Sequence, residues 1–193
     1  MTRCDDCGDG RTGGGKGQSM KITLDLLRAM GACADGLAWF EAKLGAEADY
    51  QAALDLAVAD SRIEWACWAL SAIGGTNDVT EVDGATETRA HVVVAGTLKV
   101  RGSLCVSGRV AAGSGIKAGW GIKAGEGIKA GYSIHATLTI SARLRIFAGL
   151  VSWRLPTAEE TEIVARAVTG TIAHGAFRAL PSPSGGAKSL ATS

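Results

Sequence analysis

The stretch that decides the fold lies at residues 113–136 and reads GSGIKAGWGIKAGEGIKAGYSIHA. Nearly the same six residues, Gly-x-Gly-Ile-Lys-Ala, occur here four times in succession. A unit this short cannot bury a hydrophobic face alone, so each copy must depend on its neighbours. The repeat therefore predicts a solenoid.

The alternation of side chains extends this pattern over residues 91–149. A large apolar residue recurs every six positions, at 98, 104, 110, 116, 122, 128, 134, 140 and 146, and a smaller apolar residue follows two positions later. The odd positions are mostly Lys, Arg, Ser, Thr, His or Gly. Period two is the pattern of a strand with one buried face, and the register does not slip.

The period of six indicates coils rather than hairpins, because no reversing turn such as Asn-Gly recurs. A chain that bends the same way every six residues closes a triangular coil after about three repeats, and coils stack at roughly 4.8 Å as parallel strands. Residues eighteen apart then become neighbours. We expect about three coils, with Gly at the bends for positive φ and close backbone approach.

The flanking segments differ in composition from this region. Apolar residues at helical spacing predict helices over 20–75, where Ser61 and Glu64 form a capping box, and this block is expected to cap one end of the solenoid. The fold class is therefore α+β: a small N-terminal helical bundle, a short parallel β-helix and a C-terminal β cap.

The remaining boundaries follow from polarity. Gly-rich and polar segments predict disordered tails at both ends and a connector between the helices and the solenoid, at 1–19, 181–193 and 76–90. Residues 150–180 form the predicted C-terminal cap, where Thr157 and Glu160 open a helical turn. Strand is favoured over 163–178, and helix remains the alternative for 158–168.

Composition excludes several classes of protein. The net charge of +1 does not favour direct nucleic-acid binding, and no apolar run is long enough to span a membrane. The five cysteines are odd in number and mostly isolated, so we expect no disulfide scaffold. A cytoplasmic protein is expected.

Motifs that suggest cofactors are incomplete. Cys4 and Cys7 supply half of a zinc site, and the Gly-rich run ending at Lys16 lacks the Ser or Thr of a phosphate loop. Gly113-x-Gly115-x-x-Ala118 copies a dinucleotide fingerprint, but it recurs with the repeat and no helix can follow each copy. The histidines are scattered. We expect no catalytic residues, cofactor or metal.

Three motifs in order resemble uncharacterised bacteriophage proteins with Gly-Ile-x-Ala-Gly repeats. They are the Trp-rich IEWACWAL at 63–70, FAGLVSWRLP at 147–156, and TGTIAHG at 169–175. Lys stands at 117, 123 and 129 where those proteins carry Glu. The stretch 96–110 is also similar to bactofilins, the polymer-forming β-helices. The phage resemblance implies an accessory protein, of the kind that often serves host takeover or anti-defence, which includes anti-CRISPR proteins.

Candidate binding residues lie on the outward positions of the repeat. Residues eighteen apart predict one basic stripe, Lys99–Lys117–His135, whereas a solvated outer face is the plainer interpretation. Further candidates are the bend residues and the other lysines, namely Trp120, Glu126, Tyr132, Lys123 and Lys129. In the plainer interpretation the two aromatic rings pack over a Gly-lined bend, and Trp65 and Trp68 pack the helical block.

The leading functional hypothesis is a non-enzymatic phage or prophage accessory protein that binds a host protein or ribonucleoprotein complex. Its narrowest form is an anti-CRISPR inhibitor. A self-assembling structural β-helix, and so a homo-oligomer, is the first alternative. A small-molecule or nucleotide binder, with its site in a cleft between helices and coil, is the second.

Overall fold

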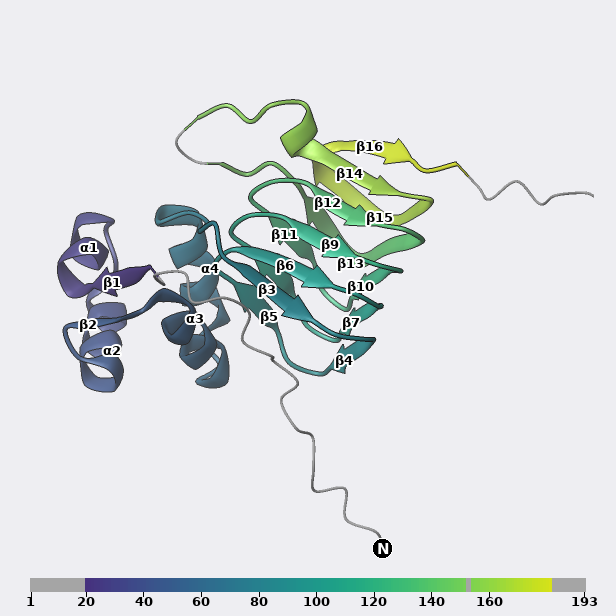
Figure 1. The fold of residues 1–193 in the computed structure, drawn as a ribbon. Coiled ribbons are helices and arrows are strands. Elements are labelled where there is room, and N and C mark those ends of the chain that lie inside the picture. The colour runs from purple at the N-terminus through teal and green to yellow at the C-terminus, as the bar shows by residue number, and fades with distance from the viewer. Residues whose placement is uncertain (1–19, 152–153, 182–193) are drawn as a thin grey trace, which may run out of the picture.

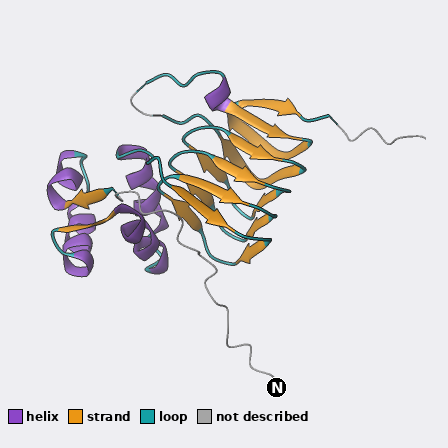
Figure 2. Cartoon of the chain, viewed as in Figure 1, coloured by secondary structure: helices purple, strands orange, loops and turns teal. Residues whose placement is uncertain are grey.

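The computed structural model describes residues 20–151 and 154–181, which form an α+β fold. The N-terminal part is mostly helical and the rest mostly strands, as Figure 2 shows. This arrangement confirms the predicted fold class, a small helical region followed by a parallel β-solenoid.

The helical region contains α1 (Leu24–Ala29), α2 (Ala34–Leu44), α3 (Tyr50–Ala59) and α4 (Ile63–Ala72). Helical spacing does not predict its two short strands, β1 (Lys21–Thr23) and β2 (Glu47–Asp49), which pair antiparallel. The last residue of each strand caps the helix that follows. Thr23 Oγ1 accepts a hydrogen bond from Leu26 N at 3.2 Å, and Asp49 Oδ1 accepts one from Ala52 N at 2.8 Å.

The predicted capping box at Ser61 and Glu64 is wrong. Helix α4 begins after Arg62 without a side-chain cap, and Ser61 has a left-handed φ of 58°. Ser61 instead ends α3, because its N–H donates to Val58 O and the N–H of Arg62 donates to Ala57 O. This pair of bonds is the Schellman pattern of a helix C-terminus.

The solenoid has three faces over the described residues (Figure 1). The first face is a sheet of β3 (Val79–Val82), β6 (Thr97–Val100), β9 (Ile116–Ala118), β12 (Ile134–Ala136), β14 (Glu162–Ala165) and β16 (Ala176–Ala179). The second holds β4 (Thr86–Thr88), β7 (Leu104–Val106) and β10 (Ile122–Ala124), and the third holds β5 (Val92–Val94), β8 (Val110–Ala112) and β11 (Ile128–Ala130). Strands β13 (Thr139–Phe147) and β15 (Ala167–His174) continue from the second face onto the third.

Neighbouring coils stack in parallel with the predicted offset. Ile122 pairs with Leu104 on one side and with Ile140 on the other, eighteen residues away in each direction. The aliphatic side chains inside the tube are almost completely buried, and Ile116, Ile134, Ile140 and Ile146 each have 0% exposure. Each buried isoleucine stabilises the fold by about 1.5–3 kcal/mol, so the interior columns hold the coils together.

The glycine that opens each repeat lies at a bend, where the backbone of two coils comes close. A Cβ on Gly125 would lie 2.0 Å from Ser107 O, and one on Gly119 would lie 2.0 Å from Arg101 O. Neither glycine has a positive φ. Close approach to the carbonyl of the coil below, and not backbone handedness, therefore requires glycine here.

The solenoid is longer than predicted. Residues 76–90, expected as a connector, contain β3 and β4, which stack in register beneath β6 and β7. After β13 the chain leaves the stack, forms a 3₁₀ turn at Glu159–Thr161 and returns as β14, so the strand assignment over 163–178 is confirmed and a helix at 158–168 is wrong. Thr157 and Glu160 exchange the expected capping bonds.

The helical region lies beside the solenoid instead of capping its end (Figure 1). Helices α3 and α4 pack on the third face, where Val93 and Ala111 are buried against them. Gln51 of α3 also bonds the free edge of β5. Its Oε1 accepts from Ala95 N at 2.8 Å and its Nε2 donates to Val93 O at 2.9 Å, as a neighbouring strand would.

The bend glycines yield a stability prediction. We expect Gly125→Ala to lower the free energy of unfolding by about 1–3 kcal/mol, because the carbonyl of Ser107 cannot move without disturbing the ladder. Gly115→Ala is the matched control, since its Cβ would lie 3.3 Å from the nearest atom, Ser133 O. Urea unfolding followed by circular dichroism measures both variants. Equal losses in the two variants would contradict this explanation of the repeat.

Candidate functional site

The predicted stripe forms on the first face. Lys99, Lys117 and His135 are in register on β6, β9 and β12, which confirms their stacking. The stripe is not purely basic, because Glu81 lies beside Lys99 in the coil below and pairs with it at 2.7 Å. Lys117 has no carboxylate partner among the described residues. The free positive charge of the stripe is therefore centred on Lys117.

His135 is the titratable member of this stripe. Its Nε2 lies 3.0 Å from Ser133 Oγ. Partial burial, followed by the positive charge of Lys117, holds the pKa of His135 below its usual value, and Arg178 adds to this effect while Glu162 opposes it. The imidazole is consequently harder to protonate in the folded protein than in the unfolded chain.

The bend residues are dispersed over different corners of the coil. Trp120 follows β9 at the corner between the first and second faces, Glu126 follows β10, and Tyr132 follows β11. Glu126 pairs with Arg109 at 3.5 Å. Tyr132 lies under the guanidinium of Arg154, at 5.9 Å from the ring centroid. The predicted residues therefore do not form one surface.

Arg154 belongs to the segment that returns the chain to the solenoid. It pairs with Glu160, and this guanidinium together with the N–H of Thr157 lowers the pKa of Glu160 to about 2. The ion pair closes the segment over the Tyr132 corner, so that ring is half-buried. Tyr132 is thus partly covered by Arg154, unlike the exposed aromatic side chain that a docking role would require.

The three repeat lysines point to three different faces. Lys117 and Lys123 are exposed on the first and second faces. Lys129 is half-buried on the third face, where its Nζ donates to Ser71 Oγ of α4 at 2.7 Å. Lys129 is therefore engaged by the helical region, whereas the other two lysines are exposed.

Trp120 is the most exposed aromatic side chain among those described, at 59%. Leu138 lies directly above it in the same corner column, where its N–H donates to Trp120 O at 2.7 Å, and is 39% exposed. We call this pair the Trp120–Leu138 ridge. Lys117 and Lys123 flank it on the adjoining strands, and Arg166 follows it in the column, since its N–H donates to Leu138 O.

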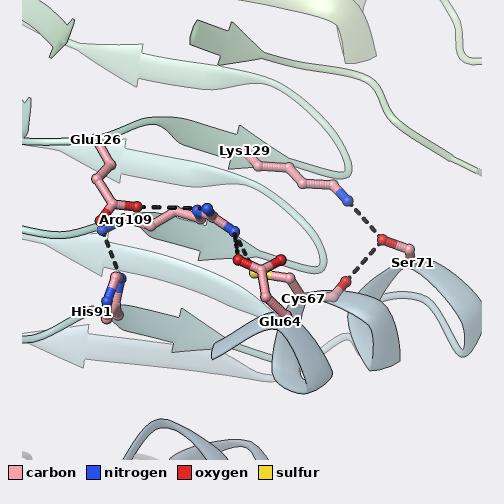
Figure 3. A network of polar contacts seen from close by, with 7 residues as sticks. All are labelled: Glu64, Cys67, Ser71, His91, Arg109, Glu126 and Lys129. Atoms are coloured by element: carbon pink, nitrogen blue, oxygen red, sulfur yellow. Dashed lines mark hydrogen bonds and ion pairs between the residues drawn. The ribbon is translucent and has the colours of Figure 1, made fainter. Parts of the chain in front are cut away.

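A polar network joins α4 to the solenoid (Figure 3). Arg109 lies between Glu64 and Glu126, at 3.3 and 3.5 Å, and its Nη1 also donates to Cys67 Sγ at 3.5 Å. These partners raise the pKa of Arg109, with the Cys67 contact as the largest cause. The backbone N–H of Arg109 donates to His91 Nδ1 at 3.0 Å, so the residue is held through its backbone as well as through its guanidinium group.

The helical region contains an apolar cleft of about 270 Å³ between its two helix pairs. Trp39, Trp65 and Phe40 are among the residues that line it, and Trp39 and Trp65 meet edge to face at 5.8 Å. Trp65 and Trp68 are both half-buried in the helical region, in agreement with their expected packing role.

Cofactor motifs find little support in the described part of the chain. Cys4, Cys7 and the Gly-rich run ending at Lys16 lie outside the described residues. The stretch from Gly113 to Ala118 leads into β9 and no helix follows it. Among the residues that the structure describes, no cluster of three His, Cys, Asp or Glu side chains is placed to hold a metal, and none of the helices has the length and apolarity to cross a membrane.

The lowered pKa of His135 makes the stability of the fold depend on pH. The unfolded chain protonates His135 near pH 6.5, whereas the folded chain resists, so stability is greatest above pH 6.5 and falls as the pH drops below it. We expect the melting temperature to fall less in His135→Gln than in the wild type between pH 7.5 and 5. The lowered pKa values of Glu81 and Glu162 keep their ion pairs intact in this window. Identical profiles for the two proteins would refute the assignment to His135.

Comparison with known proteins gives a partial likeness. Residues 20–73 match the family model of the YdhT N-terminal domain. The matched segment is the helical region from β1 to α4, and the solenoid lies outside it. No curated protein and no solved structure shows significant similarity to the chain.

Proposed function

We propose that this protein is a non-enzymatic binding protein that holds a macromolecular partner at the Trp120–Leu138 ridge. The observation that carries the proposal is Trp120, an aromatic side chain more than half exposed on a fixed bend. Tryptophan is enriched among the residues that dominate binding energy at protein interfaces. An acidic protein surface with an apolar pocket is the partner that this ridge fits.

The backbone of the ridge is ordered before any partner arrives. Trp120 N donates to Gly102 O at 3.1 Å in the coil below, and Trp120 O accepts from Leu138 N in the coil above. A bend held from both sides loses little conformational entropy on binding. The solenoid thus presents the Trp120 ring with little entropic cost of binding.

Charge around the ridge favours an acidic partner. Lys117, Lys123 and Arg166 surround it, and none of the three has a carboxylate partner among the described residues. Unpaired surface cations steer an oppositely charged surface and speed its association. The binding rate is therefore expected to fall as salt concentration rises.

The narrower form of the proposal is a phage or prophage accessory protein that acts against host defence, with a CRISPR ribonucleoprotein complex as its partner in the host cytoplasm. Its support is the resemblance in three motifs, which fall on α4, on the end of β13 with the segment that follows, and on β15. An acidic protein subunit of such a complex suits the charge of the ridge.

Capture from bacterial lysates tests the main proposal. The immobilised protein is expected to retain a specific host protein, identified by mass spectrometry, that Trp120→Ala binds at least about tenfold more weakly. Met30→Ala is the control, because Met30 is 44% exposed but lies in the helical region. Lys117→Glu with Lys123→Glu is expected to slow association. A partner that binds Trp120→Ala and wild type equally would refute the role of the ridge.

Self-assembly is the second candidate, and it is favoured by the open ends of the tube. Phe177 of β16 continues the interior column above Ile163, yet it is 43% exposed because no coil covers it among the described residues. At the other end, Thr80 begins the same column below Leu98. A second copy stacked in register would place its β3 over β16 and its Glu81 beside Arg178.

Analytical ultracentrifugation tests this assembly. If copies stack end to end, the wild type sediments as oligomers at micromolar concentration. Arg178→Glu then shifts the distribution towards monomer, because the introduced carboxylate would face Glu81 of the next copy. Arg166→Glu, with the charge change placed on the ridge column, should leave the distribution unchanged. A wild type that remains monomeric up to about 100 µM excludes the second candidate.

A further inference from the structure

The third face of the solenoid is only partly covered by the helices. Its outward column runs through Val93, Ala111, Lys129 and Phe147 on successive coils. Val93 and Ala111 are buried under α3 and α4, whereas Lys129 and Phe147 are half-buried. A groove of about 570 Å³ opens between α4 and this upper part of the face.

The walls of the groove differ in character. Helix α4 supplies Glu64, Cys67, Trp68 and Ser71, whose spacing places them along one side of the helix. The opposite wall comes from the solenoid, where the apolar side chains of Leu144 and Phe147 lie beside basic residues. Gly127 adds no side chain, which keeps the floor open beneath Arg145.

The groove carries an excess of positive charge. Arg109, Lys129 and Arg145 line it against the single carboxylate of Glu64 among the described lining residues. Arg109 is already balanced by Glu64 and Glu126. Among the described residues, Lys129 forms a hydrogen bond with the hydroxyl of Ser71 and has no carboxylate partner (Figure 3). Arg145 has no carboxylate partner among these residues either. Two cations without a carboxylate partner among the described residues therefore lie beside the apolar side chains of Leu144 and Phe147.

These two cations are spaced to share one acidic group. Gly127 lies beneath Arg145, and Lys129 lies beneath Phe147, so the two cations sit on adjacent coils with an offset of two residues. Strand spacing and rise per residue then separate their Cα atoms by roughly 8 Å. Side chains of this length reach a single carboxylate, sulfonate or phosphate group from both sides.

We propose that this groove binds a small organic anion with a flat apolar body. Lys129 and Arg145 hold its acidic group, and Trp68, Leu144 and Phe147 contact its body. The volume lies in the range of small-molecule sites, which occur preferentially between domains. The groove lies on the third face, opposite the corner that carries Trp120, so this site is independent of the partner proposed above.

The apolar cleft in the helical region provides an internal contrast. It is lined almost entirely by apolar side chains and carries none of the three groove cations. A neutral aromatic compound is expected to enter the cleft, whereas the groove should select a compound of the same shape that carries an acid. A matched pair of fluorescent probes separates the two sites.

The first experiment titrates the protein with 8-anilinonaphthalene-1-sulfonate and with its neutral counterpart N-phenyl-1-naphthylamine. In the double variant Lys129→Gln with Arg145→Gln, the affinity for the sulfonate is expected to fall at least about tenfold, because the sulfonate group binds to these two cations. The affinity for the neutral probe is expected to stay unchanged. Lys117→Gln with Lys123→Gln is the matched control, since both lysines occupy the same place in the repeat on other faces. Unchanged sulfonate affinity in the groove variant overturns the proposal.

Competition identifies the ligand class. In the wild type, 1-naphthyl phosphate and 1-naphthoate should displace the sulfonate at concentrations where inorganic phosphate does not, because the body contributes to binding. Displacement by inorganic phosphate at equal concentration, or by an acidic peptide but not by the naphthyl compounds, would overturn the assignment to a small organic anion.

A second measurement locates the site directly. Cys67 lines the groove, whereas Cys33 is exposed on the helical region and Cys105 lies on the second face. Bound 1-naphthyl phosphate should slow alkylation of Cys67 by iodoacetamide, measured by peptide mass spectrometry, and leave the rates at Cys33 and Cys105 unchanged. Equal protection of the three thiols, or no protection of Cys67, places the ligand elsewhere and refutes the proposal.

Discussion

The register between coils, in which paired residues from β3 to β13 lie eighteen positions apart, governs the rest of this structure. Parallel pairing brings Leu104, Ile122 and Ile140 into one interior column, and the inward positions of the other strands up to β13 follow the same interval. Because the tube is narrow, its side chains contact those of the coils above and below. The interval changes after β13, where the chain leaves the stack before β14 pairs with β12. Because the inward residues stack in register, the outward residues of successive coils also form columns.

Close stacking also determines where glycine is required and where the surface can vary. At a bend, the first position lies against the carbonyl of the coil below, so a side chain at Gly119 or Gly125 would collide with it. The next position faces outward and accepts Trp120, Glu126 or Tyr132. The repeat therefore fixes its glycines by packing and leaves one outward position per bend free to vary. The variable side chains are then distributed among corners rather than gathered on one strand.

Much of this architecture is predictable from the chain alone, and the exceptions have identifiable causes. Alternation and period six suffice to predict the coil and the stacking of Lys99, Lys117 and His135, because both are properties of the repeat. The first coil is not predictable in the same way, since an open end tolerates the inward Thr80 and Thr86 in place of aliphatic residues. The position of the helices leaves a signal at Val93 and Ala111, which are apolar at outward positions where the later repeats carry lysine.

The candidate sites depend on contacts that no repeat encodes. Leu138 joins Trp120 only because the corner positions also stack at the interval of eighteen residues, and the groove exists only because α4 covers the lower rows of the third face and stops. Two contacts hold the helices in this position on the third face. Gln51 bonds the free edge of β5, and Arg109 pairs with both Glu64 and Glu126. The helical region thus shields the third face and defines the groove at its border, while the opposite corner stays open. Because the proposed ligand site lies at the border of the shielded third face and the proposed partner site at the opposite corner, we expect that occupation of one leaves the other accessible.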